Sequence, residues 1–149
     1  MTELAKTFCA LAIILVVVSC SKVSQERLQG TWQVKEIKEI PVDIFDVWSH
    51  WLDTTQVKVV FFENGSLKTF YLSNDSLSGF SMGKYELNEE DEKLLIADTS
   101  LVFNPHGYPL DVILLRRNKL VLEGRYYLNA IETTLPPDSF KVLQWTLEK

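Results

Sequence analysis

Three side chains between residues 46 and 53 have the spacing of a metal site. Asp46, His50 and Asp53 follow one another at i, i+4 and i+7, so a helix would carry both carboxylates and the imidazole on one face. The apolar residues of the stretch fall mostly on the opposite face: Ile44, Phe45, Trp48, Trp51 and Leu52. A polar face of this kind is usually solvated, so we expect a short amphipathic helix and no bound metal.

No other group of residues predicts catalysis. His106 lies in a Pro- and Gly-containing loop without an acidic residue close in sequence, and the acidic run 89–92 has the composition of a solvated turn. The sequence contains no nucleophile elbow, HExxH, P-loop or GxGxxG motif. We therefore expect no catalytic residue, no cofactor and no enzymatic activity. A hydrolase would require His50 or His106 to lie beside a buried carboxylate and a hydroxyl group.

The two cysteines lie near the N-terminus, in a pattern typical of secretion. Cys9 falls inside the apolar run 8–18, which is shorter than the roughly 20 residues that span a bilayer but has the length of a signal-peptide core. Val17-Val18-Ser19-Cys20 follows, and it resembles the lipobox of bacterial lipoproteins. The resemblance implies that residues 1–19 are removed as a signal peptide and that Cys20 carries diacylglycerol and fatty acyl chains of the palmitate type. The alternative is an uncleaved, buried N-terminal helix.

From Cys20 onward the sequence predicts a lipidated tether, residues 20–27, followed by one domain, residues 28–149. The absence of further cysteines excludes disulfides and thiolate metal sites there. The net charge of −5 and the lack of a basic stripe along the sequence argue against nucleic-acid binding. The lipid is the only membrane contact that we expect, and two or three acyl chains give stable anchoring where one does not.

The domain has the alternation and the turn residues of an all-β fold. Trp32 and Val34 share one face of the first strand, whereas Ile37 and Ile40 change phase, which predicts a bulge near Lys35. Asn64-Gly65 predicts a two-residue hairpin in which both turn residues have positive φ. The expected strands are 31–40, 56–62, 66–72, 79–87, 93–97, 100–103, 110–116, 119–131 with a kink at Gly124, and 140–147. Eight or nine short antiparallel strands with one inserted helix favour an up-and-down barrel, with a sandwich as the alternative.

Short motifs in this domain resemble lipocalins. Leu28-x-Gly30-x-Trp32 is similar to their Gly-x-Trp signature, and the stretches 59–67, 83–87 and 119–123 are similar to lipocalin-like lipoproteins of the Bacteroidetes type. The resemblance implies a membrane-tethered β-barrel with a small hydrophobic ligand as its usual cargo. In lipocalins an arginine of the last strand packs across the tryptophan, and this last strand offers Lys149 in its place. Gly30 and Trp32 are therefore expected to be structural, with Gly30 turning the chain without a Cβ clash and Trp32 plugging one end.

The sequence leaves two functions open. A binding module would line a cavity with inward residues, for which the candidates are Phe61, Tyr71, Tyr85, Trp48 and Trp51. A barrel filled by its own 7 Phe, 5 Tyr and 4 Trp would instead act as a structural or interaction module for another envelope protein, with an exposed aromatic patch expected at 103–108. The helix near Trp48 and Trp51 is either a lid over the pocket or a plug that completes the core.

The residues after Cys20 bear on localisation. Ser21 rather than aspartate follows the cysteine, which by resemblance to other lipoproteins favours the outer membrane, and the absence of an acidic run there favours the periplasmic side.

Overall fold

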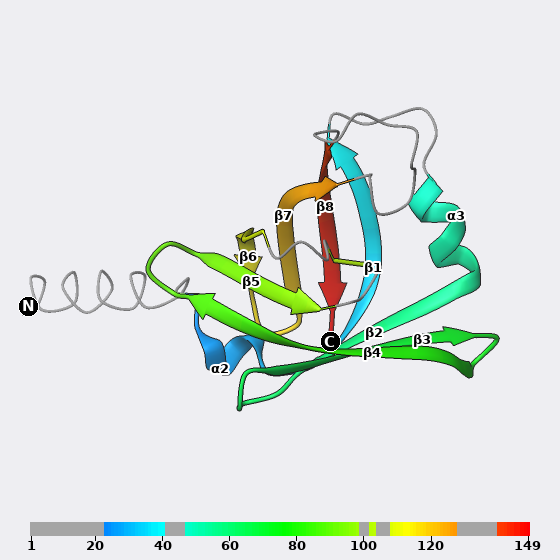
Figure 1. Ribbon diagram of the computed structural model, residues 1–149, viewed down its shortest axis with the longest axis horizontal. Coiled ribbons are helices and arrows are strands. Elements are labelled where there is room, and N and C mark those ends of the chain that lie inside the picture. The colour runs from blue at the N-terminus through cyan, green and yellow to red at the C-terminus, as the bar shows by residue number, and fades with distance from the viewer. Residues whose placement is uncertain (1–22, 41–46, 99–101, 104–107, 128–139) are drawn as a thin grey trace, which may run out of the picture.

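Eight antiparallel strands close into a barrel in which every strand pairs with its neighbours in sequence and β8 pairs with β1 (Figure 1). The computed structural model describes residues 23–40, 47–98, 102–103, 108–127 and 140–149. The expected signal peptide, Cys20, Asp46 and His106 lie outside these residues. The elements are α2 (Gln25–Leu28), β1 (Gly30–Ile40), α3 (Val47–Thr54), β2 (Thr55–Phe61), β3 (Ser66–Ser73), β4 (Ser76–Asn88), β5 (Lys93–Asp98), β6 (Leu110–Leu115), β7 (Lys119–Tyr127) and β8 (Phe140–Glu148).

The predicted all-β barrel and its bulge are confirmed. The β1–β8 register shifts between Val34 and Glu36, so Lys35 is the extra residue that moves Ile37 back into the core. β7 is continuous through Gly124, as the predicted strand with a kink there requires, and the ribbon of β7 is strongly curved (Figure 1). Gly124 also serves a close approach, since an added Cβ would clash with Cδ2 of Leu110.

The strand predicted at 100–103 is also wrong where the structure describes it. Val102 and Phe103 form a bend, and both side chains are buried. The strand pairing between β5 and β6 is short, covering Lys93 with Asp111 and Leu94 with Leu110. Val102 and Phe103, which lie between these strands in the sequence, join the core cluster. They cover core that a longer β5–β6 pairing would otherwise cover.

The hairpin turns differ from the expectation in type. The β2–β3 connection runs through Phe62–Gly65, and within it Gly65 has a positive φ of 78° while Asn64 does not. The two-residue turn with positive φ at both positions lies instead at Asn74-Asp75, between β3 and β4, with φ of 49° and 61°. Asn and Asp tolerate this conformation better than other non-glycine residues, which explains their presence there.

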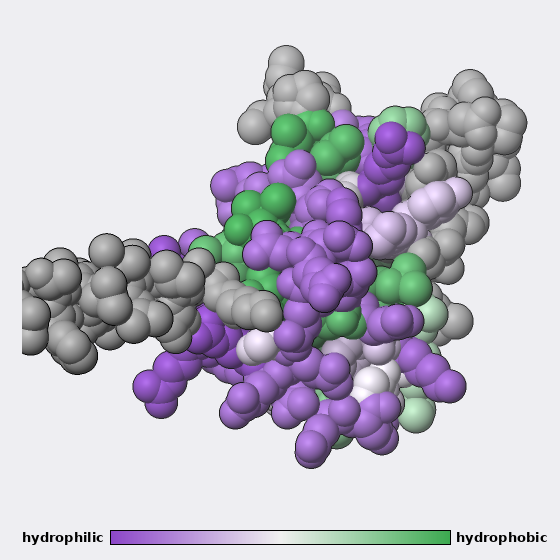
Figure 2. All heavy atoms as spheres, turned by 90° about the vertical axis from the view of Figure 1, so that its left-hand side faces the viewer, coloured by the Kyte–Doolittle hydropathy of each residue, from purple (hydrophilic) through white to green (hydrophobic). Residues whose placement is uncertain are grey.

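Alternation along the strands gives the barrel one apolar interior. The core cluster extends from Val23 and Leu28, ahead of β1, to Leu147 in β8. The face of the barrel shown in Figure 2 is mostly hydrophilic, with a few apolar groups between the polar ones. Among the described residues no helix has the length and apolar character needed to cross a bilayer.

Candidate functional site

The strand directions define two ends of the barrel. At the first end β1 begins, β2 ends and β8 ends, and at the second end β1 ends, β2 begins and β8 begins. We call these the Trp32 end and the Tyr71 end, after an inward-facing aromatic residue near each.

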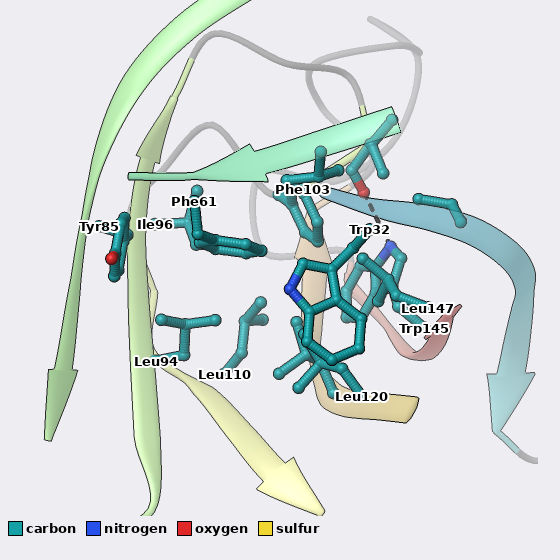
Figure 3. Close-up of a cluster of buried hydrophobic side chains, with 14 of the residues drawn as sticks. Trp32, Phe61, Tyr85, Leu94, Ile96, Phe103, Leu110, Leu120, Trp145 and Leu147 are labelled. Atoms are coloured by element: carbon teal, nitrogen blue, oxygen red, sulfur yellow. Dashed lines mark hydrogen bonds between the residues drawn. The ribbon is translucent and has the colours of Figure 1, made fainter. Parts of the chain in front are cut away.

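The Trp32 end is filled by aromatic and aliphatic side chains (Figure 3). The Trp32 indole is fully buried, and its Nε1 donates a hydrogen bond to the carbonyl oxygen of Leu28 at 2.7 Å. This bond satisfies the one polar atom of the side chain and fixes α2 against the start of β1. The expectation that Trp32 closes one end of the interior agrees with this geometry.

Lys149 covers Trp32 from outside the core. Its ammonium nitrogen lies 4.6 Å from the ring centroid and donates hydrogen bonds to the carbonyl oxygens of Gln29 at 2.8 Å and Arg27 at 3.1 Å. The first is a cation–π contact across Trp32, the position that the lipocalin resemblance assigns to an arginine, and the two hydrogen bonds cap the end of α2. Burial lowers the pKa of the Lys149 ammonium group.

Gly30 is required by its backbone conformation. Its φ is +113°, a region that residues with a side chain rarely adopt. The expected Cβ clash is not the reason, because an added Cβ would meet the Lys149 side chain at an ordinary 3.6 Å.

Two of the proposed ligand residues, Phe61 and Tyr85, lie at the Trp32 end and contact each other. Their rings meet edge to face with centroids 5.1 Å apart, and both side chains are buried. The Tyr85 hydroxyl donates to the carbonyl oxygen of Phe62 at 2.6 Å. Burial raises the pKa of Tyr85, while a hydrogen bond with Gln25 opposes this rise.

A bend between β5 and β6 completes the Trp32 end. Phe103 is 1% exposed and its ring centroid lies 6.0 Å from that of Trp145, whose Nε1 donates to the carbonyl oxygen of Val102 at 2.9 Å. The aromatic patch expected at 103–108 is therefore wrong for Phe103, although Tyr108 is exposed. The apolar pair Val102-Phe103 was visible in the sequence, but its insertion depends on the short β5–β6 seam, which no local pattern encodes.

The Tyr71 end contains a polar group that the described residues leave without a partner. The Tyr71 side chain is half-buried, but its hydroxyl oxygen is fully buried and has no hydrogen-bond partner. The ring of Trp51, from α3, lies against it with centroids 6.1 Å apart. Tyr126 of β7 is buried nearby, and burial, with a smaller contribution from Tyr71, raises the pKa of Tyr126 to about 12.

The five proposed ligand residues therefore do not form one cluster. Phe61 and Tyr85 pack at the Trp32 end, whereas Tyr71 and Trp51 meet at the opposite end. The side chain of Trp48 lies outside the described residues. Tyr126 was missed, although the period-2 series Leu120, Leu122, Gly124 and Tyr126 could have placed it inside the barrel.

A polar recess of about 330 Å³ opens beside the C-terminus of α3 and the β3–β4 turn. It is lined by Asp53, Thr54, Gln56, Leu72, Ser73, Asn74 and Asp75. Asp53 is exposed there, while Asp46 and the His50 side chain lie outside the described residues, so the proposed metal-binding spacing is not tested. Among the residues that the structure describes, no three His, Cys, Asp or Glu side chains come together as a metal site.

Comparisons with protein-family models and with curated proteins found no match. The structural finding is an eight-stranded, up-and-down β-barrel in which the Tyr71 phenol is buried without a hydrogen-bond partner among the described residues.

Proposed function

We propose that this chain is a lipid-anchored envelope lipoprotein whose barrel binds a small hydrophobic ligand at the Tyr71 end. The ligand class is an apolar body that carries one hydrogen-bonding group, such as a hydroxyl or a carboxyl. The proposed role is binding, without catalysis or a cofactor.

The observation that carries this proposal is the buried hydroxyl of Tyr71. A buried polar group without a partner costs about 1–3 kcal/mol, so folded proteins rarely keep one without a use. The Trp51 ring lies against the Tyr71 ring, and Tyr126 is close enough to interact electrostatically with Tyr71, so this end offers aromatic groups to an apolar ligand body. A ligand group placed against the Tyr71 hydroxyl would remove the cost that the free protein bears.

The anchor is the second part of the proposal, and it rests on the lipobox resemblance at Cys20. Val23 is buried in the core, so only Ser21 and Lys22 separate Cys20 from the first core residue, a distance of three residue steps. At roughly 3.4 Å per extended residue the lipid would lie about 10 Å from the domain. In our proposal the barrel therefore lies at the membrane surface, on the periplasmic side of the outer membrane.

Two experiments test the two parts separately. Intact-mass analysis of the protein from its native envelope should show loss of residues 1–19 and addition of acyl chains, both abolished by Cys20→Ser. An uncut, unmodified polypeptide would contradict the anchor.

For the ligand, a fluorescent long-chain fatty acid serves as the probe. We expect Tyr71→Phe to weaken its binding about fivefold, as loss of one hydrogen bond predicts. The matched control Tyr85→Phe removes the same atom at the filled end and should leave the affinity unchanged. Equal effects of both variants, or no saturable binding by the unaltered protein, would contradict the proposal.

The second candidate function is an interaction module without a ligand. Exposed apolar side chains on β4 favour it, since Leu77, Phe80 and Met82 are each about 60% exposed. It requires that no small molecule co-purifies with the protein in native mass spectrometry.

A further inference from the structure

The outer surface of β2, β3 and β4 differs from the rest of the barrel. These strands form the lower wall in Figure 1. We call their outward-facing residues the basic–apolar wall. Its members are Lys58 and Val60 of β2, Lys68, Phe70 and Leu72 of β3, and Leu77, Phe80, Met82 and Lys84 of β4.

Strand register brings apolar and basic side chains into one patch. Lys58 pairs with Phe70, which pairs with Phe80, and in the next outward row Val60 pairs with Lys68, which pairs with Met82. Residues directly opposite one another in such pairs have Cβ atoms about 4.5–5.5 Å apart. The alternate positions, from Val57 to Thr69, are buried, which fixes the side chains of these rows on the outside.

The charge of this wall is opposite to that of the chain. Its strands carry outward Lys58, Lys68 and Lys84 against one outward carboxylate, Glu86, whereas the whole chain has a net charge of −5. No ion pair joins any of these three lysines to another described residue, in contrast to Lys38, Lys93 and Lys141. The lysines are therefore available to an anionic partner.

We propose that the basic–apolar wall docks on the surface of an anionic phospholipid bilayer. Phe80, Met82 and Leu77 would enter the boundary between headgroups and acyl chains, while the three lysines contact acidic headgroups through their flexible stems. Long cationic side chains around exposed aromatic and aliphatic groups are the combination that interfacial membrane binding requires. A protein partner is the competing occupant, but it would not require the lysines to be interspersed among the apolar groups.

This inference goes beyond the lipid anchor and the ligand site, because it gives the barrel a fixed orientation on the membrane. The basic–apolar wall could not be predicted from the sequence, because Lys58, Lys68 and Lys84 are ten or more residues apart. Only the register of the three strands brings them into one patch.

The test uses the full chain with Cys9→Ser and Cys20→Ser, so that its outcome is independent of lipidation. An environment-sensitive dye is attached to Met82→Cys or, as the matched control, to Ile113→Cys. Ile113 is 55% exposed on β6, which lies opposite β2 in the closed order of strands. The apolar N-terminal run is present in every variant and contributes equally.

With vesicles that contain phosphatidylglycerol, we expect a blue shift and quenching by spin-labelled lipid for the dye at position 82 and neither for the dye at position 113. Both signals should fall as salt is raised, because exposed charges are screened beyond about 10 Å at 0.1 M. Vesicles of phosphatidylcholine alone should give a much smaller signal at position 82.

Replacing Lys58, Lys68 and Lys84 with Gln should reduce the ratio of docked to undocked barrel on the order of a hundredfold, at about fivefold per lysine. The control triple, with Gln at Lys35, Lys38 and Lys119, removes the same charge from other strands and should retain docking. Equal signals at positions 82 and 113, equal effects of the two triples, or protection of position 82 only after another protein is added would overturn the proposal. Unchanged circular dichroism verifies that both triples remain folded.

Discussion

The two ends of the barrel both bury aromatic side chains, but they differ in whether the polar atoms of these side chains have hydrogen-bond partners. At the Trp32 end every polar atom of the large aromatic residues has a partner: Trp32 donates to Leu28, Trp145 to Val102 and Tyr85 to Phe62. At the Tyr71 end the phenol of Tyr71 is buried without one among the described residues. A fully satisfied aromatic cluster is typical of a structural element, whereas the unsatisfied Tyr71 hydroxyl is the reason that we propose a ligand site at the other end.

Truncation of Trp32 and of Trp51 should give the largest difference in the free energy of unfolding between the two ends. Trp32→Ala removes a fully buried indole together with its hydrogen bond, so we expect a loss of about 3–5 kcal/mol in the free energy of unfolding. Trp51→Ala removes a half-buried ring from α3 and should cost less than half as much. Urea denaturation followed by circular dichroism measures both values, and equal losses would remove the distinction between the ends.

Replacing Gly30 and Gly79 with alanine should give the next largest difference in stability. Gly30→Ala forces a side chain into φ of +113° and should destabilise the fold by about 2 kcal/mol. Gly79→Ala in β4 meets only Tyr71 at an ordinary 3.8 Å and has no such backbone strain, so its effect should stay within about 0.5 kcal/mol. Thermal unfolding of both variants checks this, and a harmless Gly30→Ala would show that the entry to β1 is not conformationally constrained.

Alkaline pH should act through the Tyr71 end. The unfolded phenol of Tyr126 ionises near pH 10.0, whereas the folded one keeps its proton until about 12, so folded protein binds more protons between these values and stability falls as pH rises. Allowing for solvent screening, the loss is about 1–2 kcal/mol. The Tyr126→Phe variant should not show this part of the loss of stability at alkaline pH. The same pH slope of unfolding free energy in both proteins would contradict the assignment.

Lys149 should make the smallest contribution of this series. Lys149→Met keeps much of the apolar stem but loses the contact with the Trp32 ring and the two carbonyl caps, for an expected cost of about 1 kcal/mol. Lys149→Arg should restore most of it, because guanidinium also stacks on aromatic faces. If the Met and Arg variants unfold alike, the cation has no role at the Trp32 end.

The Trp32 end was largely predictable from sequence because its signals are local. The phase change at Lys35 predicts the bulge that the structure contains. The contact of Lys149 with Trp32 is not local and was suggested only by the lipocalin resemblance. The insertion of Val102 and Phe103 could not be predicted, since it depends on how far β5 and β6 pair. A short apolar run followed by a Pro- and Gly-containing loop has the same pattern whether it forms a strand or a plug.

The Tyr71 end was only partly predictable because its properties arise from distant segments. Tyr71 and Trp51 were expected near a ligand, but the hydrogen-bonding state of a phenol depends on side chains from several strands. Phe61 and Tyr85 had the same inward pattern in the sequence, and only the closed barrel shows that they lie at the other end. Alternation assigns a residue to a face of a strand but does not say how far along the barrel it lies.

The difference between the two tyrosines can be measured as the free energies of unfolding of Tyr71→Phe and Tyr85→Phe, compared side by side without ligand. Each variant removes a single hydroxyl oxygen from a barrel tyrosine. We expect opposite signs, with Tyr71→Phe stabilising by about 1 kcal/mol because an unpaired group is lost, and Tyr85→Phe destabilising by about 1 kcal/mol because the Phe62 carbonyl loses its donor. Destabilisation of similar size in both variants would show that the Tyr71 hydroxyl is already satisfied in the free protein and would contradict a ligand site at that end.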